Sequence, residues 1–206
     1  MEYSEYNITY YFYNFVELFI LKDFQRSVQL INEYLSFEND EKVVDIGGGT
    51  GTISNFVEKM GNQVAIVDPS KGLLSSVKNS NIILLRSSGS DIPVKNNVFD
   101  TALLINTLHH IDKKFHKKVF LECFRILKKN GRLFIIDLKK PRKFSRMLFA
   151  KYDQIFSGGM TFYYDPNDLN AFLKKVGFNN VDVFSNLNKS PTKEREGPRY
   201  VVIARK

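Results

Sequence analysis

The sequence predicts an α/β protein with a doubly wound sheet of seven strands, mostly parallel, and three observations carry this prediction. Short apolar runs alternate along the chain with stretches of helical spacing, which is the pattern of a parallel sheet covered by helices. The first five runs are almost continuously apolar, as expected for strands buried on both faces. The connection before the last run has no helical pattern, so a hairpin-like link there should make the last strand antiparallel.

The elements can be placed in order along the chain. The runs expected to form strands are 42–46, 63–68, 81–87, 100–106, 131–137, 181–185 and 199–205. The stretches expected to form helices between them are 52–60, 71–78, 113–128 and 166–176. The last helix has clear end signals, because Asp165 can cap it, Pro166 follows at the first helical position and Gly177 stands at its end.

Two longer segments lie outside this alternation. Residues 10–35 carry apolar side chains at spacings of three and four, which predicts amphipathic helices. Residues 138–165 separate the fifth strand from the last helix, and loops of that length in a compact protein are usually lids or binding elements. The length of 206 residues suits a single domain over residues 1–206.

Composition limits the classes of protein that fit. The chain has one cysteine, Cys123, so neither a disulfide framework nor a cysteine zinc site can be built within it, and no metal site is predicted. No stretch reaches ~18 continuous apolar residues, and the first residues lack a basic signal region, so we expect a cytoplasmic protein without a membrane span. The net charge of +8 favours anionic partners without distinguishing nucleic acid from a small molecule.

The stretch "VVDIGGGTG" carries the most specific signal. A dinucleotide site needs G-x-G-x-x-G, but the last position of that pattern is Thr52, and no Gly-Lys-Ser/Thr follows as in a P-loop. The pattern that fits is Asp45-x-Gly47-x-Gly49-x-Gly51, with an acid at the end of the first strand. A carboxylate there repels a pyrophosphate and suits a ligand that carries an ammonium group.

This stretch resembles motif I of class I S-adenosylmethionine-dependent methyltransferases, and four further segments resemble the family in order. They are "IVDPS", "SSGSDIPVKNNVFDTALLINTLHHI", "ILKKNGRLFIID" and "DLNAFLKKVGFNNVDV". The resemblance covers roughly residues 40–206 and is strongest to the type 11 small-molecule branch that includes ubiquinone/menaquinone-biosynthesis methyltransferases. It implies a Rossmann-like fold in which an N-terminal helical cap (1–38) and a helical cap insertion (138–165) cover S-adenosylmethionine, which becomes S-adenosylhomocysteine.

The resemblance also assigns cofactor-binding positions. Asp45 and the backbone of the glycine loop would face the methionine part of the cofactor, with a charge-assisted contact to its ammonium group. Asp68 would hold the ribose hydroxyls, unless it instead caps the next helix, and Pro69 could pack on the adenine. Asn106 and Thr107, which close the fourth strand, should line the crevice near the sulfonium.

The adenine loop departs from the family pattern. Alignment on Ile92–Pro93 places Ser88 where the family has an acid and Gly89 where it has alanine. The Ser88 hydroxyl could accept from the adenine amino group, and the Gly89 N–H could donate to a ring nitrogen. Asp91 is an alternative if the loop is shifted, and Ser88 is preferred.

A histidine pair follows the fourth strand. His109 and His110 are candidates for a catalytic base, with His110 favoured, if the acceptor must lose a proton. The alternative is that the pair packs the start of a helix. His116, which lies among lysines, is expected to face solvent.

The methyl acceptor is the least constrained part of the prediction. Seven aromatic residues could wall an apolar pocket for an aromatic acceptor or form the core of the cap: Tyr10, Tyr11, Phe149, Tyr152, Phe156, Phe162 and Tyr163. The basic run Lys139–Arg146 could serve an anionic acceptor or nucleic acid, or remain a solvated loop. A small-molecule acceptor is favoured. The alternatives are an RNA or protein methyltransferase and a catalytically silent cofactor-binding protein, and the sequence does not address the oligomeric state.

Overall fold

The computed structural model describes residues 23–139, 162–185, 187, 189–190, 193–194 and 199–206. The chain divides into two compact units, Met1–Ser36 and Phe37–Lys206. The first unit contains a helix over residues 23–34, which confirms the later part of the helical segment expected at 10–35. Residues 10–22 of that segment lie outside the described residues.

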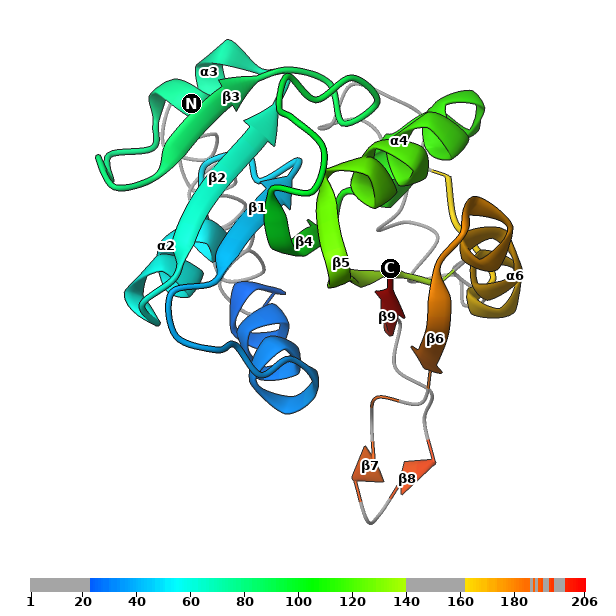
Figure 1. Ribbon diagram of the computed structural model, residues 1–206. Coiled ribbons are helices and arrows are strands. Elements are labelled where there is room, and N and C mark those ends of the chain that lie inside the picture. The colour runs from blue at the N-terminus through cyan, green and yellow to red at the C-terminus, as the bar shows by residue number, and fades with distance from the viewer. Residues whose placement is uncertain (1–22, 140–161, 186, 188, 191–192, 195–198) are drawn as a thin grey trace, which may run out of the picture. The chain divides into compact units, whose positions relative to one another are not determined.

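The second unit is built on a seven-stranded sheet with the strand order β3-β2-β1-β4-β5-β9-β6 (Figure 1). Its strands are β1 (Lys42–Ile46), β2 (Gln63–Asp68), β3 (Ile83–Arg86), β4 (Phe99–Ile105), β5 (Leu127–Leu138), β6 (Asn179–Phe184) and β9 (Arg199–Arg205). Neighbours from β3 to β5 pair in parallel, whereas β9 runs antiparallel to both β5 and β6. The predicted doubly wound, seven-stranded sheet with an antiparallel last strand is confirmed.

The helices that follow the strands are α2 (Thr52–Lys59), α3 (Lys71–Ser75), α4 (Lys113–Ile126) and α6 (Pro166–Val176), together with the short 3₁₀ helix η1 (Leu108–His110). The predicted ends of α6 are confirmed. The Asp165 carboxylate accepts from the Asn167 N–H at 2.9 Å, Pro166 is the first helical residue, and Gly177 ends the helix with φ of 120°. Between β6 and β9 the chain forms the two-residue strands β7 (Lys189–Ser190) and β8 (Lys193–Glu194), which pair with each other.

A single apolar cluster joins one face of the sheet to the helices α4 and α6. It includes Val44 of β1 and Leu104 of β4 from the sheet, Phe120 of α4, and Leu173 of α6, all of which are fully buried. The Phe120 ring meets Phe172 edge-on, with ring centroids 5.6 Å apart. This layer fixes the central strands, whose carboxyl ends then meet at one edge.

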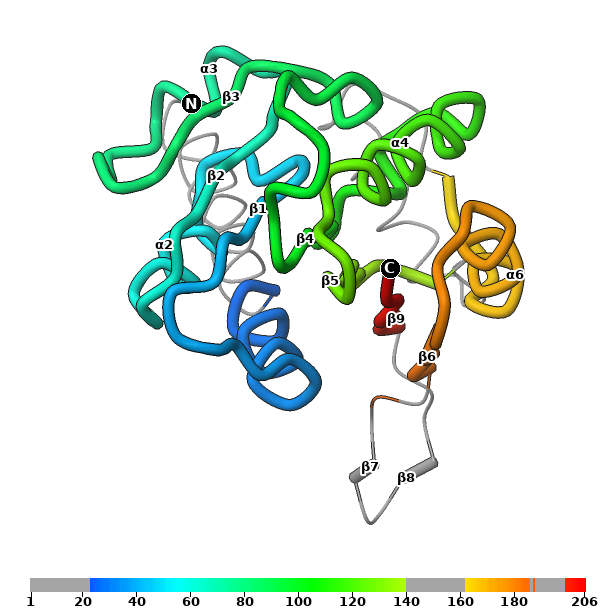
Figure 2. The backbone as a smooth tube through the Cα atoms, in the orientation of Figure 1, coloured from blue at the N-terminus to red at the C-terminus, as the bar shows by residue number. Residues whose placement is uncertain are grey.

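The chain reverses its direction of progress across the sheet after β3. Figure 2 shows it passing from β1 through β2 to β3 and then crossing back to β4 on the other side of β1. In open α/β sheets, ligands bind in the crevice at such a switch point, outside the carboxyl ends of the strands. The carboxyl ends of β1, β2 and β4 are therefore where a site is expected.

The third strand differs from the prediction. It was expected over residues 81–87 as a strand buried on both faces, but β3 is shorter and lies at the edge of the sheet. Ile83 is 62% exposed and Leu84 is 41% exposed. The prediction of burial was wrong here because an apolar run does not reveal whether a strand has a neighbour on each side.

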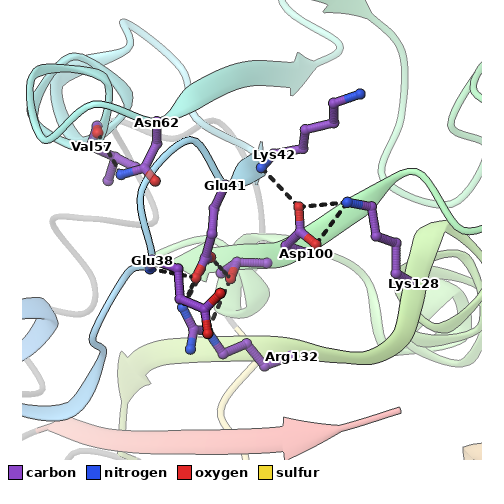
Figure 3. Close-up of polar contacts among 9 residues, drawn as sticks. Glu38, Glu41, Lys42, Val57, Asn62, Asp100, Lys128 and Arg132 are labelled. Carbon is purple, nitrogen blue, oxygen red and sulfur yellow. Dashed lines mark hydrogen bonds and ion pairs between the residues drawn. The ribbon is translucent and has the colours of Figure 1, made fainter.

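At the amino ends of the central strands, opposite the switch point, the sheet is held by ion pairs (Figure 3). The Arg132 guanidinium donates to both oxygens of Glu41, at 2.7 and 3.0 Å, and to the Thr101 hydroxyl at 3.0 Å. Asp100 accepts from the Lys42 N–H at 3.0 Å and from the Lys128 ammonium at 2.8 Å. These contacts join the starts of β1, β4 and β5.

Among the residues that the structure describes, no helix has the length and apolar character needed to cross a membrane.

Candidate functional site

The glycine loop that follows β1 closely approaches the end of β4. Gly47 and Gly49 have φ of 75° and 54°, in the left-handed region that favours glycine. A Cβ at Gly47 would stand 2.2 Å from Cγ2 of Thr107, whereas one at Gly49 would meet only Leu73, at 3.7 Å. The loop thus packs on Thr107 at Gly47, and the space next to the Cα atom of Gly49 is less crowded. Gly51 is the N-cap of α2.

Asp45 lies beneath this loop. It is 2% exposed, and its Oδ2 accepts from the Ser54 hydroxyl at 2.6 Å. Burial raises the pKa of the Asp45 carboxyl to about 6, the Ser54 hydrogen bond opposes this rise, and the nearby Asp68 charge adds to it. A Cβ at Gly48 would come within 2.7 Å of Oδ2. The carboxylate therefore brings buried negative charge directly under the loop.

Asp68, at the end of β2, joins the glycine loop to the next helix. Its Oδ2 accepts from the Gly49 N–H at 3.1 Å, and its Oδ1 accepts from the Ser70 N–H at 2.8 Å. The N-cap of α3 is Ser70, whose hydroxyl accepts from the Leu73 N–H at 3.3 Å, so Asp68 does not have the capping role considered as its alternative. Pro69 follows in an exposed position.

The Ser88–Gly89 loop lies against the end of β1. A Cβ at Gly89 would be 2.8 Å from Cγ2 of Ile46. Ser88 is exposed, and its hydroxyl is 3.0 Å from that of Ser90. The Asp91 N–H donates to the Ser88 carbonyl at 3.1 Å, so the two candidates for the adenine contact lie in one turn. The choice of Ser88 over Asp91 stays a prediction.

Asn106 and Thr107 close β4 beside the loop. Asn106 has a left-handed φ of 53° and directs the chain away from the strand. The Thr107 hydroxyl donates to the carbonyl of Ile105 at 3.0 Å and lies 3.3 Å from that of Gly47. The structure thus brings the predicted residues of β1 and β4 into direct contact.

The two histidines after β4 differ in their surroundings. His109 is 3% exposed, and its Nδ1 lies 2.5 Å from Oδ1 of Asp137. His110 is exposed, with its ring centroid 3.9 Å from that of His109. The sequence favoured His110 as a base, and the structure gives His109 a carboxylate partner in Asp137.

His116 does not face solvent, so the prediction for it was wrong. It is fully buried, its Nε2 lies 2.7 Å from the Ile111 carbonyl, and its Nδ1 lies 2.8 Å from the Tyr164 hydroxyl. Because a carbonyl only accepts, Nε2 carries the proton and Nδ1 accepts from Tyr164. Burial lowers the pKa of His116.

Sequence reasoning missed two residues of this region, Asp137 and Ser54. Asp137 ends the apolar run "RLFIID" at the carboxyl edge of β5, as Asp45 and Asp68 end theirs, and this position is the signal that could have identified it. Ser54 had no such signal, because its role depends on the first turns of α2 packing over Asp45.

Only part of the predicted acceptor region is described. The Phe162 N–H donates to the His109 carbonyl at 2.7 Å, and the Tyr163 ring lies parallel to that of His109 with centroids 6.2 Å apart. The other five aromatic residues named above lie outside the described residues, as does the basic run apart from Lys139.

This arrangement suits a cationic nucleoside better than a phosphate. Asp45 and Asp68 place two carboxylates at one loop, which disfavours pyrophosphate. Each oxygen of Asp68 accepts one backbone N–H, and since a carboxylate oxygen has two lone pairs, both can still accept a ribose hydroxyl. In the part of the chain that is described, no group of three or more His, Cys, Asp or Glu side chains could hold a metal ion.

Comparison with known proteins agrees with this geometry. Residues 44–135 match the family described as "Methyltransferase domain". A ubiquinone/menaquinone biosynthesis C-methyltransferase of Wigglesworthia glossinidia brevipalpis is 27% identical over 113 residues, which cover 50% of this chain and 44% of that protein. The chain thus matches less than half the length of this relative.

Solved structures share the fold at low sequence identity. A possible histamine N-methyltransferase from Thermotoga maritima has a TM-score of 0.73 at 22% identity, covering 94% of this chain and 95% of that one. A Haemonchus contortus phosphoethanolamine N-methyltransferase, solved with S-adenosylhomocysteine, has a TM-score of 0.70 at 15% identity, covering 88% and 52%. Residues 44–135 of this chain are therefore similar to a methyltransferase domain, and the chain shares the fold of solved S-adenosylmethionine-dependent methyltransferases.

Proposed function

We propose that this protein transfers a methyl group from S-adenosylmethionine to a small-molecule acceptor. The observation that carries the proposal is the convergence of Asp45, Asp68 and Thr107 on one glycine loop at the switch point of the sheet. When bound there, the cofactor supplies a methyl group on a positively charged sulfur.

Each residue of the loop region has a distinct part in this proposal. Asp68 would hold the ribose hydroxyls, and Asp45 would neutralise the ammonium group of the methionine part from beneath the loop. Gly49 would let the ligand approach the loop closely, because only Leu73 lies near its Cβ position, while Thr107 fixes the loop from the side of β4. Orientation of donor and acceptor can supply much of the rate, since effective molarities reach about 10⁵ to 10⁸ M.

An aromatic hydroxyl-bearing acceptor suits the described residues best. The Tyr163 ring lies parallel to that of His109, the Phe162 ring packs edge-on against His116, and the Wigglesworthia relative is named for ubiquinone and menaquinone biosynthesis. An anionic acceptor would instead depend on the basic run that begins at Lys139. We further propose a cytoplasmic site of action, because the sequence has a single cysteine and no apolar run long enough to cross a membrane.

Calorimetry with S-adenosylhomocysteine tests the cofactor site. The wild-type protein should bind it, and Asp68→Ala should weaken binding about tenfold or more, because hydrogen bonds to a charged group contribute about 1.5–3 kcal/mol each. The matched control is Asp182→Ala, which removes an exposed carboxylate of β6. Absence of binding by the wild-type protein, or equal binding by both variants, would refute the site.

A methyl-transfer screen tests the acceptor. Tritium-labelled S-adenosylmethionine would be offered with 1,4-naphthohydroquinone, with total RNA and with a protein extract, in separate reactions. Label in the naphthohydroquinone supports the proposal, whereas label only in RNA or protein supports the macromolecular alternative. Cofactor binding without transfer to any of the three supports a catalytically silent protein.

A further inference from the structure

Asp137 makes three hydrogen bonds, and two of them go to one histidine. Its Oδ1 lies 2.5 Å from Nδ1 of His109, and its Oδ2 accepts from the backbone N–H of the same residue at 3.1 Å. The Leu138 N–H donates to Oδ1 at 2.6 Å. The carboxylate therefore holds His109 by two contacts, one to its backbone N–H and one to its ring, and together they fix the orientation of the ring.

This geometry selects one form of the imidazole. A carboxylate can only accept, so Nδ1 of neutral His109 carries the proton that points at Asp137. Nε2 is then the acceptor nitrogen of the ring. A carboxylate that holds an imidazole in one tautomer leaves the second nitrogen ready to take a proton and stabilises the imidazolium that results.

The pair of Asp137 and His109 lies at the carboxyl ends of the parallel strands, where the glycine loop also lies. In the parallel pairing of β4 with β5, Ile105 is opposite Ile136, so Asp137 stands level with the end of β4. Thr107 contacts the glycine loop, and His109 lies two residues after it in the chain. Asp137 is 1% exposed and His109 is 3% exposed, so bulk water is excluded from their hydrogen bond.

The surroundings of the pair contain few charges among the described residues. Asp137 is the cross-strand partner of Tyr200, and the Asp137 charge acts on both Tyr200 and His116. Within the described part of the chain, the titratable groups that face the pair are His110 of η1, Tyr163 of the segment before α6, His116 of α4 and Tyr200 of β9.

We propose that Asp137 is a positioning residue that holds His109 as the general base for an acceptor that must lose a proton, an inference that rests on the proposed function. As the bond from the acceptor oxygen to the methyl carbon forms and the carbon–sulfur bond breaks, the proton of that hydroxyl moves to Nε2 of His109. The sulfur keeps the electron pair of the broken bond, and the positive charge passes to the imidazolium beside Asp137.

Nitrogen NMR of the side chains tests the pairing without any acceptor. The wild-type protein, labelled with nitrogen-15 in histidine, should show His109 as the Nδ1–H tautomer at pH 8, with the resonance assigned by its loss in His109→Gln. In Asp137→Asn the tautomer preference should be lost. An Nε2–H tautomer in the wild-type protein would overturn the proposal.

Kinetics with 1,4-naphthohydroquinone tests the catalytic role. His109→Gln should lower kcat about 10²-fold or more, within the range known for general bases. Asp137→Asn should lower kcat at least about tenfold with little change in the acceptor KM, Asp137→Glu should recover part of the loss, and the exposed control Asp182→Asn should match the wild type. Rates are normalised to the fraction of each variant that binds S-adenosylhomocysteine, which corrects for misfolding.

The two possible failures are distinguishable. If His109→Gln and Asp137→Asn methylate at the wild-type rate, the dyad is wrong while the methyltransferase assignment stands. If the wild-type protein binds S-adenosylhomocysteine but transfers no methyl group to any acceptor of the screen, the proposed function fails and the base role fails with it.

Discussion

The side chain of Thr107, at the end of β4, occupies the space that a side chain at Gly47 would need. Cγ2 and Oγ1 of Thr107 lie 2.2 and 2.7 Å from the position of a Cβ on Gly47. Two strands that are neighbours in the sheet but 60 residues apart in the sequence thus fix the loop jointly. The shape of the cofactor loop depends on this contact as much as on its own glycines.

We therefore expect Gly47→Ala to destabilise the protein and to weaken S-adenosylhomocysteine binding about tenfold or more. The left-handed φ of 75° adds about 1–2 kcal/mol of strain for alanine, and the clash with Thr107 adds about 1–3 kcal/mol. Urea unfolding and calorimetry measure the two effects. Gly61→Ala is the control, because Gly61 has φ of 91° but no atom within 4 Å of its Cβ position.

Addition of Thr107→Ala to Gly47→Ala tests the contact itself. The double variant should lack the clash with Thr107 but keep the backbone strain at residue 47. Its loss of stability should therefore be smaller than the sum of the two single losses. Strict additivity would show that Thr107 does not determine the loop.

The affinity for S-adenosylhomocysteine should depend on the protonation of Asp45. The pKa of this carboxyl is raised to about 6 by burial, so below pH 6 the free protein holds a proton that a bound ammonium group would have to displace. Affinity should consequently fall about tenfold between pH 7 and pH 5, and Asp45→Asn should bind weakly at both. Calorimetry across this range measures the slope.

Ser54 offers a sharper version of the same measurement. Its hydroxyl lowers the pKa of Asp45, so Ser54→Ala should raise that pKa further and move the midpoint of the affinity profile to higher pH. The exposed Ser75→Ala, whose hydroxyl donates to the Gly72 carbonyl, should leave the midpoint in place. An unchanged midpoint in Ser54→Ala would contradict the assignment.

The sequence predicts the features whose cause is local. The strand runs and the end signals of α6 both follow from residue types at fixed spacing. The acids at Asp45 and Asp68 could likewise be placed at one edge, because the carboxyl ends of parallel strands meet there.

The features that could not be predicted depend on contacts between distant residues. His116 was expected among solvated lysines, but it is buried because Tyr164, 48 residues later, reaches its Nδ1. The partner of His109 lies 28 residues away on β5 and becomes its neighbour only when β4 and β5 pair. The exposure of Ile83 likewise depends on the edge position of its strand, which no local pattern encodes.

The ion pair between Glu41 and Arg132 should matter for stability and not for binding (Figure 3). It lies at the amino-terminal edge of the sheet, opposite the glycine loop, and its side chains are 9% and 16% exposed. Arg132→Met should lower the free energy of unfolding by about 3 kcal/mol, because it leaves a buried carboxylate unpaired. Affinity for S-adenosylhomocysteine should not change.

Two further variants check the cause of that loss. Addition of Glu41→Gln to Arg132→Met removes the unpaired charge and should restore part of the stability. Lys114→Met breaks a pair with Asp112 whose side chains are 68% and 40% exposed, and it should cost less than about 1 kcal/mol. If Lys114→Met and Arg132→Met lose the same free energy of unfolding, burial of the ion pair is not the cause of the loss.

The buried His116 should make stability depend on pH. Burial lowers its pKa from 6.5, so the folded protein favours neutral His116. The stability that this preference gives is present above pH 6.5 and is lost as the pH falls below that value, because the unfolded chain then binds a proton more readily. His116→Gln should therefore differ from the wild type most at pH 8, by about 1–3 kcal/mol, and progressively less toward pH 5. Tyr164→Phe, which removes only the hydroxyl that donates to Nδ1, should cost about 1 kcal/mol at pH 8. Urea unfolding at several pH values measures these differences, and a gap between wild type and His116→Gln that stays constant with pH would show that His116 does not titrate on unfolding.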